Sequence, residues 1–222
     1  MTRLPAGLLL LAVVSVLAAP AAEAVELAGR GSIGGSGGIM LFTSGEDFGD
    51  GNQLRLIGQV GFKYNFTRNW AGVIESGFGW NAYPDDRVDH DTLATVIPTT
   101  FGAQYRFQTK GNIWPVLGAG LGFYSLGVKD TWRSWANANQ GTERLTWTSP
   151  GFYLKAGAEY IFASGTSINV DTLFHNIFSE DTERFPDMWG NQNTSFWQLR
   201  VGLSYYFKLP GAGAGPDLGD GG

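Results

Sequence analysis

The sequence predicts an all-β fold, an eight-stranded antiparallel up-and-down transmembrane β-barrel, and three observations carry that prediction. Segments of about a dozen residues repeatedly alternate apolar and polar side chains, the pattern of a strand with two different faces. The connections between these segments are alternately short and long. After the N-terminal segment, the chain lacks any apolar run of about 20 residues, which a membrane helix requires.

Composition limits the classes of function. The chain has 222 residues, a formal net charge of -5 and no cysteine. An acidic balance argues against nucleic acid as a partner, because nucleic-acid binders usually carry excess positive charge. The absence of cysteine excludes disulfides, cysteine zinc sites and thiol catalysis. We expect no cofactor, no metal centre and no enzymatic activity.

Residues 1–24 have the layout of a secretory signal peptide. Arg3 supplies a short positive region, a leucine-rich apolar stretch follows, and Ala22-Glu23-Ala24 fits the small-x-small cleavage rule. The alternative is a single transmembrane anchor, but the apolar stretch is short and ends at Pro20. We therefore expect cleavage, with residues 25–207 forming the barrel domain.

Eight segments have strand character. Alternation is most regular in residues 54–66, 97–107, 152–162 and 197–207, and less regular in 30–42, 70–80, 113–126 and 167–178. Tight turns are expected at 67–69, 108–112 and 163–166, and long loops at 43–53, 81–92, 127–145 and 179–193. Short turns at one end and long loops at the other are typical of outer-membrane barrels. A cleaved signal would place the long loops outside the cell.

The charged faces of these strands predict which wall is turned inward. Their charged residues are Arg55, Lys63, Glu75, Arg106, Lys155, Glu159, Asp171 and Arg200. An eight-stranded barrel has an interior wide enough only for side chains, and an aromatic residue at every second position would overfill it. The apolar wall should therefore face lipid, whereas a soluble lipocalin-like barrel would have the opposite orientation.

Aromatic residues near the tight turns predict a membrane-interface girdle. The expected members are Tyr64, Phe66, Trp70, Tyr105, Phe107, Trp114, Tyr160, Phe162, Tyr205 and Phe207. At the other end, Trp132, Trp135 and Trp147 flank the third long loop and are expected in the outer girdle; an adhesive patch is the alternative.

Three segments resemble a known family. Residues 101–107 (FGAQYRF) and 116–124 (VLGAGLGFY) resemble the fourth and fifth strands of the outer-membrane β-barrel domain family, which is similar to the OmpA transmembrane domain and OmpX. Residues 200–207 resemble the C-terminal signal of that family, with Arg200, Gly202, Tyr205 and Phe207 at the matching places. The resemblance implies an outer-membrane location, contact with membrane lipids and lipopolysaccharide, and the barrel assembly machinery as a partner during biogenesis.

The chain departs from that family after Phe207. The glycine- and proline-rich residues 208–222 are expected to form a disordered periplasmic tail, because they carry too few apolar side chains to pack. We therefore expect no periplasmic peptidoglycan-binding domain of the OmpA kind.

The lumen charges allow two interpretations, a polar pathway for water or ions and a salt-bridged plug. Buried charges must be paired to be tolerated, which favours the plug. Glu75, Glu159 and Asp171 would then each pair with one or more of the basic residues. The leading function is envelope integrity or surface interaction, and the alternative is a narrow porin or OmpW-like passage of small solutes.

A third function is considered because His175 faces the lumen with Ser179 four residues later. Lipid A deacylases of the PagL type are barrels that use a histidine and a serine, but with a spacing of two. We therefore expect His175 to be structural.

The third long loop is near neutral, whereas the first, second and fourth are acidic. Their carboxylates are Glu46, Asp47, Asp50, Asp85, Asp86, Asp89, Asp91, Glu180, Asp181, Glu183 and Asp187. Such loops could bind divalent cations beside lipopolysaccharide, present a receptor surface for an unidentified ligand, or form a solvated repulsive surface.

Overall fold

The computed structural model describes residues 26–44, 55–84, 91–109, 111–133, 140–179 and 193–209. The strands are β1 (Arg30–Ser44), β2 (Arg55–Asn65), β3 (Trp70–Pro84), β4 (Asp91–Arg106), β5 (Ile113–Arg133), β6 (Gln140–Ile161), β7 (Thr166–Ile177) and β8 (Thr194–Lys208). Within these ranges there is no helix with the length and apolar character needed to cross a membrane. The predicted signal peptide, most of the tail and the acidic loop residues other than Asp91 lie outside the described residues.

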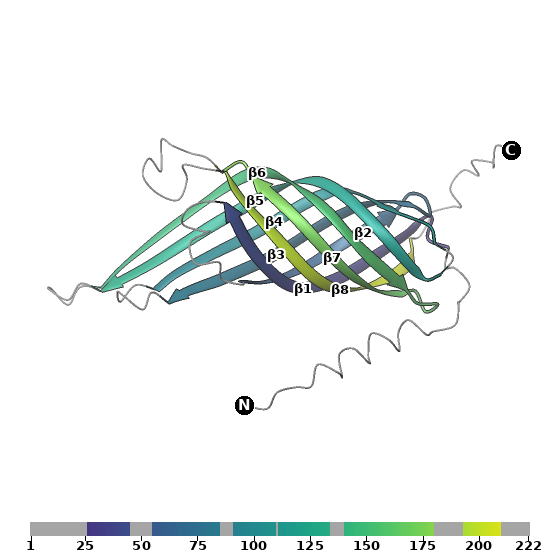
Figure 1. Ribbon diagram of the computed structural model, residues 1–222, viewed down its shortest axis with the longest axis horizontal. Coiled ribbons are helices and arrows are strands. Elements are labelled where there is room, and N and C mark those ends of the chain that lie inside the picture. The colour runs from purple at the N-terminus through teal and green to yellow at the C-terminus, as the bar shows by residue number, and fades with distance from the viewer. Residues whose placement is uncertain are drawn as a thin grey trace, which may run out of the picture.

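The eight strands form a closed antiparallel barrel in sequence order (Figure 1). Each strand pairs with the next, and β8 returns to pair with β1 from Arg30↔Lys208 to Ser44↔Ser195, with a register shift between Phe42 and Ser44. Closure gives every strand two hydrogen-bonded neighbours, which is how a sheet satisfies its backbone groups inside hydrocarbon. The predicted fold class is therefore confirmed.

The apolar face of the strands points outward. Val60 is 68% exposed, Ile33 60% and Leu203 59%, whereas Arg106 and Arg200 on the opposite face are fully buried or nearly so. Side chains alternate in this way because successive residues of a strand point to opposite sides of the sheet. Contact of this apolar outer surface with lipid is favourable, whereas its contact with water is not.

Two predicted loops are partly strand. The β3–β4 hairpin continues to Pro84 and Asp91, and the β5–β6 hairpin continues to the Arg133↔Gln140 pair. Figure 1 shows these hairpins projecting beyond the other strands at one end of the barrel. The predicted loop boundaries were wrong here because they were placed where apolar alternation stops. Antiparallel backbone pairing continues beyond that point without an apolar face. The exposed hydroxyls of Ser125 and Thr148, which lie 2.8 Å apart, show that the outer face is already polar at this level.

Two tryptophans assigned to the girdles point inward instead. Trp114 is buried with Leu27, Ile161 and Tyr206 at the end of the barrel that holds the tight turns. Trp147 is buried in an apolar cluster at the opposite end. Both were assigned to a girdle because they lie near a turn or loop in the sequence. Whether a side chain faces lipid or the lumen depends instead on its alternating position along the strand. Other expected girdle residues are outward, including Phe66, Trp70, Phe107 and Tyr205.

Candidate functional site

The lumen is the part of the barrel where polar side chains converge. Space for them comes from glycines on the neighbouring strands: Gly38 lies opposite Arg200, Gly61 opposite Glu75, and Gly157 opposite Asp171. A Cβ atom placed on Gly38 would lie 2.8 Å from the Cβ of Arg200, and one on Gly61 2.7 Å from the Cγ of Glu75. These glycines therefore accommodate the charged side chains that cross the lumen.

The first cluster surrounds Glu159, near the tight-turn end. One carboxylate oxygen accepts hydrogen bonds from Lys63 Nζ at 2.8 Å, Ser167 Oγ at 2.8 Å and the Tyr206 hydroxyl at 2.7 Å. The other oxygen accepts from Arg106 Nε at 2.8 Å. Four donors from four strands thus hold one buried carboxylate.

Arg106 donates hydrogen bonds to neutral partners as well. Its Nη1 donates to Asn65 Oδ1 at 2.6 Å, and its Nη2 donates to the Tyr206 hydroxyl at 2.8 Å. A guanidinium can donate in several directions within one plane, so a single arginine links β4, β2, β6 and β8 here. Cross-linking of this kind fixes the lumen geometry.

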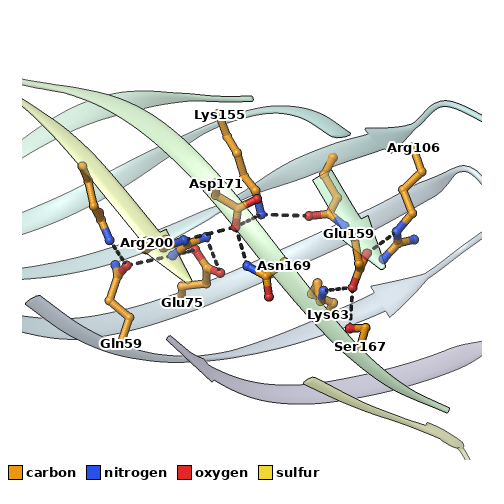
Figure 2. A network of polar contacts seen from close by, with 12 residues as sticks. Gln59, Lys63, Glu75, Arg106, Lys155, Glu159, Ser167, Asn169, Asp171 and Arg200 are labelled. Carbon is orange, nitrogen blue, oxygen red and sulfur yellow. Dashed lines mark hydrogen bonds and ion pairs between the residues drawn. The ribbon is translucent and has the colours of Figure 1, made fainter. Parts of the chain in front are cut away.

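The second cluster surrounds Arg200, near the middle of β8 (Figure 2). The guanidinium contacts Glu75 through Nη1 and Nη2, both at 2.9 Å, and Asp171 through Nε at 3.3 Å. Lys155 Nζ lies 3.1 Å from the same Asp171 oxygen. Gln59 accepts from Arg200 at 2.7 Å, so the cluster spans five strands. In Figure 2, Lys155 lies on the side of this cluster that faces Glu159.

Seven of the eight predicted lumen charges therefore take part in these two clusters. The exception is Arg55, whose guanidinium lies 4.2 Å above the centre of the Phe42 ring near the long-loop end. The predicted site residues also omitted neutral partners that hold the carboxylates, notably Ser167, Asn169 and Tyr206. The sequence signal that could have found them is their position in the strand, since every second residue of a strand faces the lumen.

Buried apolar clusters lie on both sides of the charged clusters. At the tight-turn end the cluster is Leu27, Trp114, Ile161 and Tyr206. At the long-loop end it is Met40, Phe42, Ile57, Val96, Tyr124, Leu126, Trp147, Ile177 and Phe196. The charges thus lie in a region shielded from water, where each pair interacts more strongly than it would in solvent.

His175 and Ser179 do not form a nucleophile–base pair. His175 stacks on Phe196 with ring centroids 4.4 Å apart, and its ring nitrogens lie 2.9 Å from the Tyr124 hydroxyl and 3.2 Å from Gln198 Oε1. The Ser179 hydroxyl donates to Thr194 at 2.8 Å. Both side chains are buried on the lumen side, away from the lipid that a deacylase would have to reach. Within the described ranges, acidic and histidine side chains form no metal-binding group.

The residues of the predicted assembly signal all lie in β8. Arg200 and Gly202 face the lumen, whereas Tyr205 is outward and 55% exposed. Phe207 pairs with Gly31 of β1, at the seam where the last strand meets the first. Lys208, assigned from the sequence to the tail, is the last residue of β8.

A closed barrel with an apolar exterior and a charged, packed interior is a transmembrane β-barrel of the outer-membrane type. The match to a family model makes this specific: residues 9–207 match the outer membrane protein beta-barrel domain, and the chain belongs to that family. The protein is therefore located in the outer membrane. The comparison with curated proteins gives no match.

Solved structures show the same architecture. A major outer membrane protein from Thermus thermophilus is 11% identical, with a TM-score of 0.58 over 80% of this chain and 99% of that one. Neisserial surface protein A is 15% identical, with a TM-score of 0.52 over 81% and 98%. Ail, the attachment invasion locus protein of Yersinia pestis, is 12% identical, with a TM-score of 0.50 over 80% and 99%. At these identities the likeness concerns the fold alone.

Proposed function

We propose that this protein is a non-conducting, non-enzymatic barrel that serves envelope integrity or surface interaction through its long loops. The observation that carries the proposal is the filled lumen. Ion pairs join seven charged side chains across it, and buried apolar clusters lie toward both ends, which supports a closed lumen. A barrel packed in this way offers its outer wall to lipid and its loops to the surroundings.

The energetics of the lumen favour closure. A conducting path would require ion pairs such as Arg200–Glu75 to separate, and breaking a buried pair costs roughly 3–5 kcal/mol. The cavity beside that pair has a volume of ≈ 20 Å³, room for a water-sized species and not for a hydrated ion column. An open state would therefore be rare.

A surface role agrees with what one structural neighbour is named for. Ail is an attachment invasion locus protein and was crystallised with the heparin analogue sucrose octasulfate. Three of the four predicted loops of the present chain are acidic, so its partner would differ in charge from a polyanion. Divalent cations bridging to lipopolysaccharide phosphates, or a basic patch on another protein, match that chemistry.

Planar-bilayer recording tests the closed lumen. We expect the purified, refolded protein to give no stable openings. The double variant Arg200→Ser/Glu75→Ser removes a charge pair together and should raise the current. A matched control, Ile74→Ala/Leu199→Ala, changes lipid-facing neighbours on the same strands and should stay silent. Large, stable openings in the unmodified protein would end the proposal.

The OmpW-like alternative is favoured by one observation, the apolar lining at the long-loop end of the lumen. Phe42 and Phe196 lie there with ring centroids 5.1 Å apart. If this region admits small apolar solutes, proteoliposomes that contain the unmodified protein should take up such a probe faster than protein-free vesicles. Uptake should be faster still with the Phe42→Ala variant. We expect neither increase in uptake, because the ionic clusters leave no route through the lumen.

The absence of enzymatic activity is tested on lipid A. Mass spectra of lipid A from cells with the unmodified protein, with Ser179→Ala and with His175→Ala should show the same acyl chains. Loss of one chain only where Ser179 and His175 are intact would establish a deacylase. N-terminal sequencing of the purified protein tests the proposed cleavage after Ala24.

A further inference from the structure

Beside the charged clusters lies a small cavity with an unusual wall. On one side it is bounded by β1, where Gly34, Gly35 and Ser36 present almost no side chain. On the other sides it is lined by groups that include Lys63, Lys155, Arg200, Glu75, Asn169 and Ser204. Its volume is ≈ 20 Å³, more than the roughly 10–15 Å³ that one water molecule requires.

The charges of the two ion-paired clusters beside this cavity do not balance. Four cations, Lys63, Arg106, Lys155 and Arg200, are joined by ion pairs to three carboxylates, Glu75, Glu159 and Asp171. The linked groups therefore carry one excess positive charge when all are ionised. An unbalanced charge in a shielded interior is strongly unfavourable, so the fold must either neutralise a lysine or hold a counterion.

Hydrogen-bond donors remain available at the cavity. A lysine ammonium has three N–H donors. Among the described residues, Lys63 uses one hydrogen bond, to Glu159, and Lys155 contacts Asp171 and Gln104. Lys63 and Lys155 both line the cavity, together with the hydroxyls of Ser36 and Ser204, which can also donate. The lining thus offers several donors around a space of the right size for one small anion.

We propose that this cavity holds one small monovalent anion of the size of chloride. The anion balances the excess positive charge and accepts the remaining lysine and serine hydrogen bonds. It lies against the glycine-rich stretch of β1, where Gly34 and Ser36 leave space between the inner wall and the cations. Glu75 is the one carboxylate in the lining, and its engagement by Arg200 at 2.9 Å reduces its repulsion of an anion.

Bromide substitution tests the site directly. The protein, refolded and crystallised in sodium bromide, should show an anomalous scattering peak in the cavity, within hydrogen-bond distance of Lys63 or Lys155. The variant Lys155→Met leaves three cations and three carboxylates, with Asp171 still paired to Arg200, and should fold without the peak. Lys208→Met removes an exposed lysine at the end of β8 and should keep it.

Unfolding in solution gives a second measurement. With chloride exchanged for gluconate at constant ionic strength, each tenfold rise in chloride above its dissociation constant should lower the unfolding equilibrium constant up to tenfold, because unfolding releases the bound ion. Lys155→Met should lose this dependence, and Lys208→Met should retain it. A water molecule in place of the bromide peak, or a chloride dependence equal in all three proteins, would overturn the proposal.

Discussion

Glu159 is the residue on which the lumen geometry depends most. Its carboxylate accepts hydrogen bonds from Lys63, Arg106, Ser167 and Tyr206, all at 2.7–2.8 Å, and it is 1% exposed. Glu159→Gln keeps the shape of the side chain but removes the charge shared by two buried cations. Breaking a buried pair in this way costs roughly 3–5 kcal/mol because the remaining charge has no compensation. We therefore expect the unfolding equilibrium constant to rise by roughly two to four powers of ten.

The assay is urea unfolding in lipid vesicles, followed by tryptophan fluorescence and by the shift in gel migration on boiling. Glu26→Gln is the matched control, since Glu26 is exposed and contacts only the nearby Ala28 amide among the described residues. It should change stability by less than about 0.5 kcal/mol. Stability of Glu159→Gln within about 1 kcal/mol of the unmodified protein would refute the reasoning, because neither cation could then depend on this carboxylate.

The two walls of the barrel lead to three further predictions. Gly38→Ala should destabilise the fold by about 1–3 kcal/mol, since the new Cβ meets the backbone and Cβ of Arg200, whereas Gly37→Ala, with open space around it, should be silent in the same unfolding assay. Val201→Arg, midway along the lipid-facing side of β8, should cost about 2–4 kcal/mol, and Tyr205→Arg at the interface about 0–1; equal costs would contradict the membrane placement. Tyr206→Phe should cost about 1–3 kcal/mol by removing the hydroxyl between Glu159 and Arg106, with Tyr205→Phe unchanged.

Much of the fold could be predicted because the strand period is two. That period assigns Leu203 and Arg200 to opposite walls without knowledge of any neighbour. The narrow interior of a small barrel then fixes which wall is inside. Strand ends were less predictable: residues 127–133 and 140–145 carry polar side chains that suit a loop, yet their backbones pair as a ladder.

The candidate site was predictable as a set and not as a geometry. Alternation along the strands placed eight charged residues in the lumen. It could not predict which of them belong to the Glu159 cluster and which to the Arg200 cluster. Nor could it show that Arg55 lies over Phe42, or that Trp114 and Trp147 fill the two ends of the lumen. The ion-pair partners in these clusters come from different strands, so no local stretch of sequence contains a pair.

The sequence by itself determined the number of strands, the wall each side chain occupies, and the presence of a charged interior facing its own axis. The tertiary structure decided the partners. Partner choice depends on the register between strands, since register sets which residues lie at one height along the barrel. Arg200 reaches Glu75 across the lumen at 2.9 Å although the two are 125 positions apart. Closure of the barrel brings them to the same height along its axis, and a local sequence pattern cannot predict this contact.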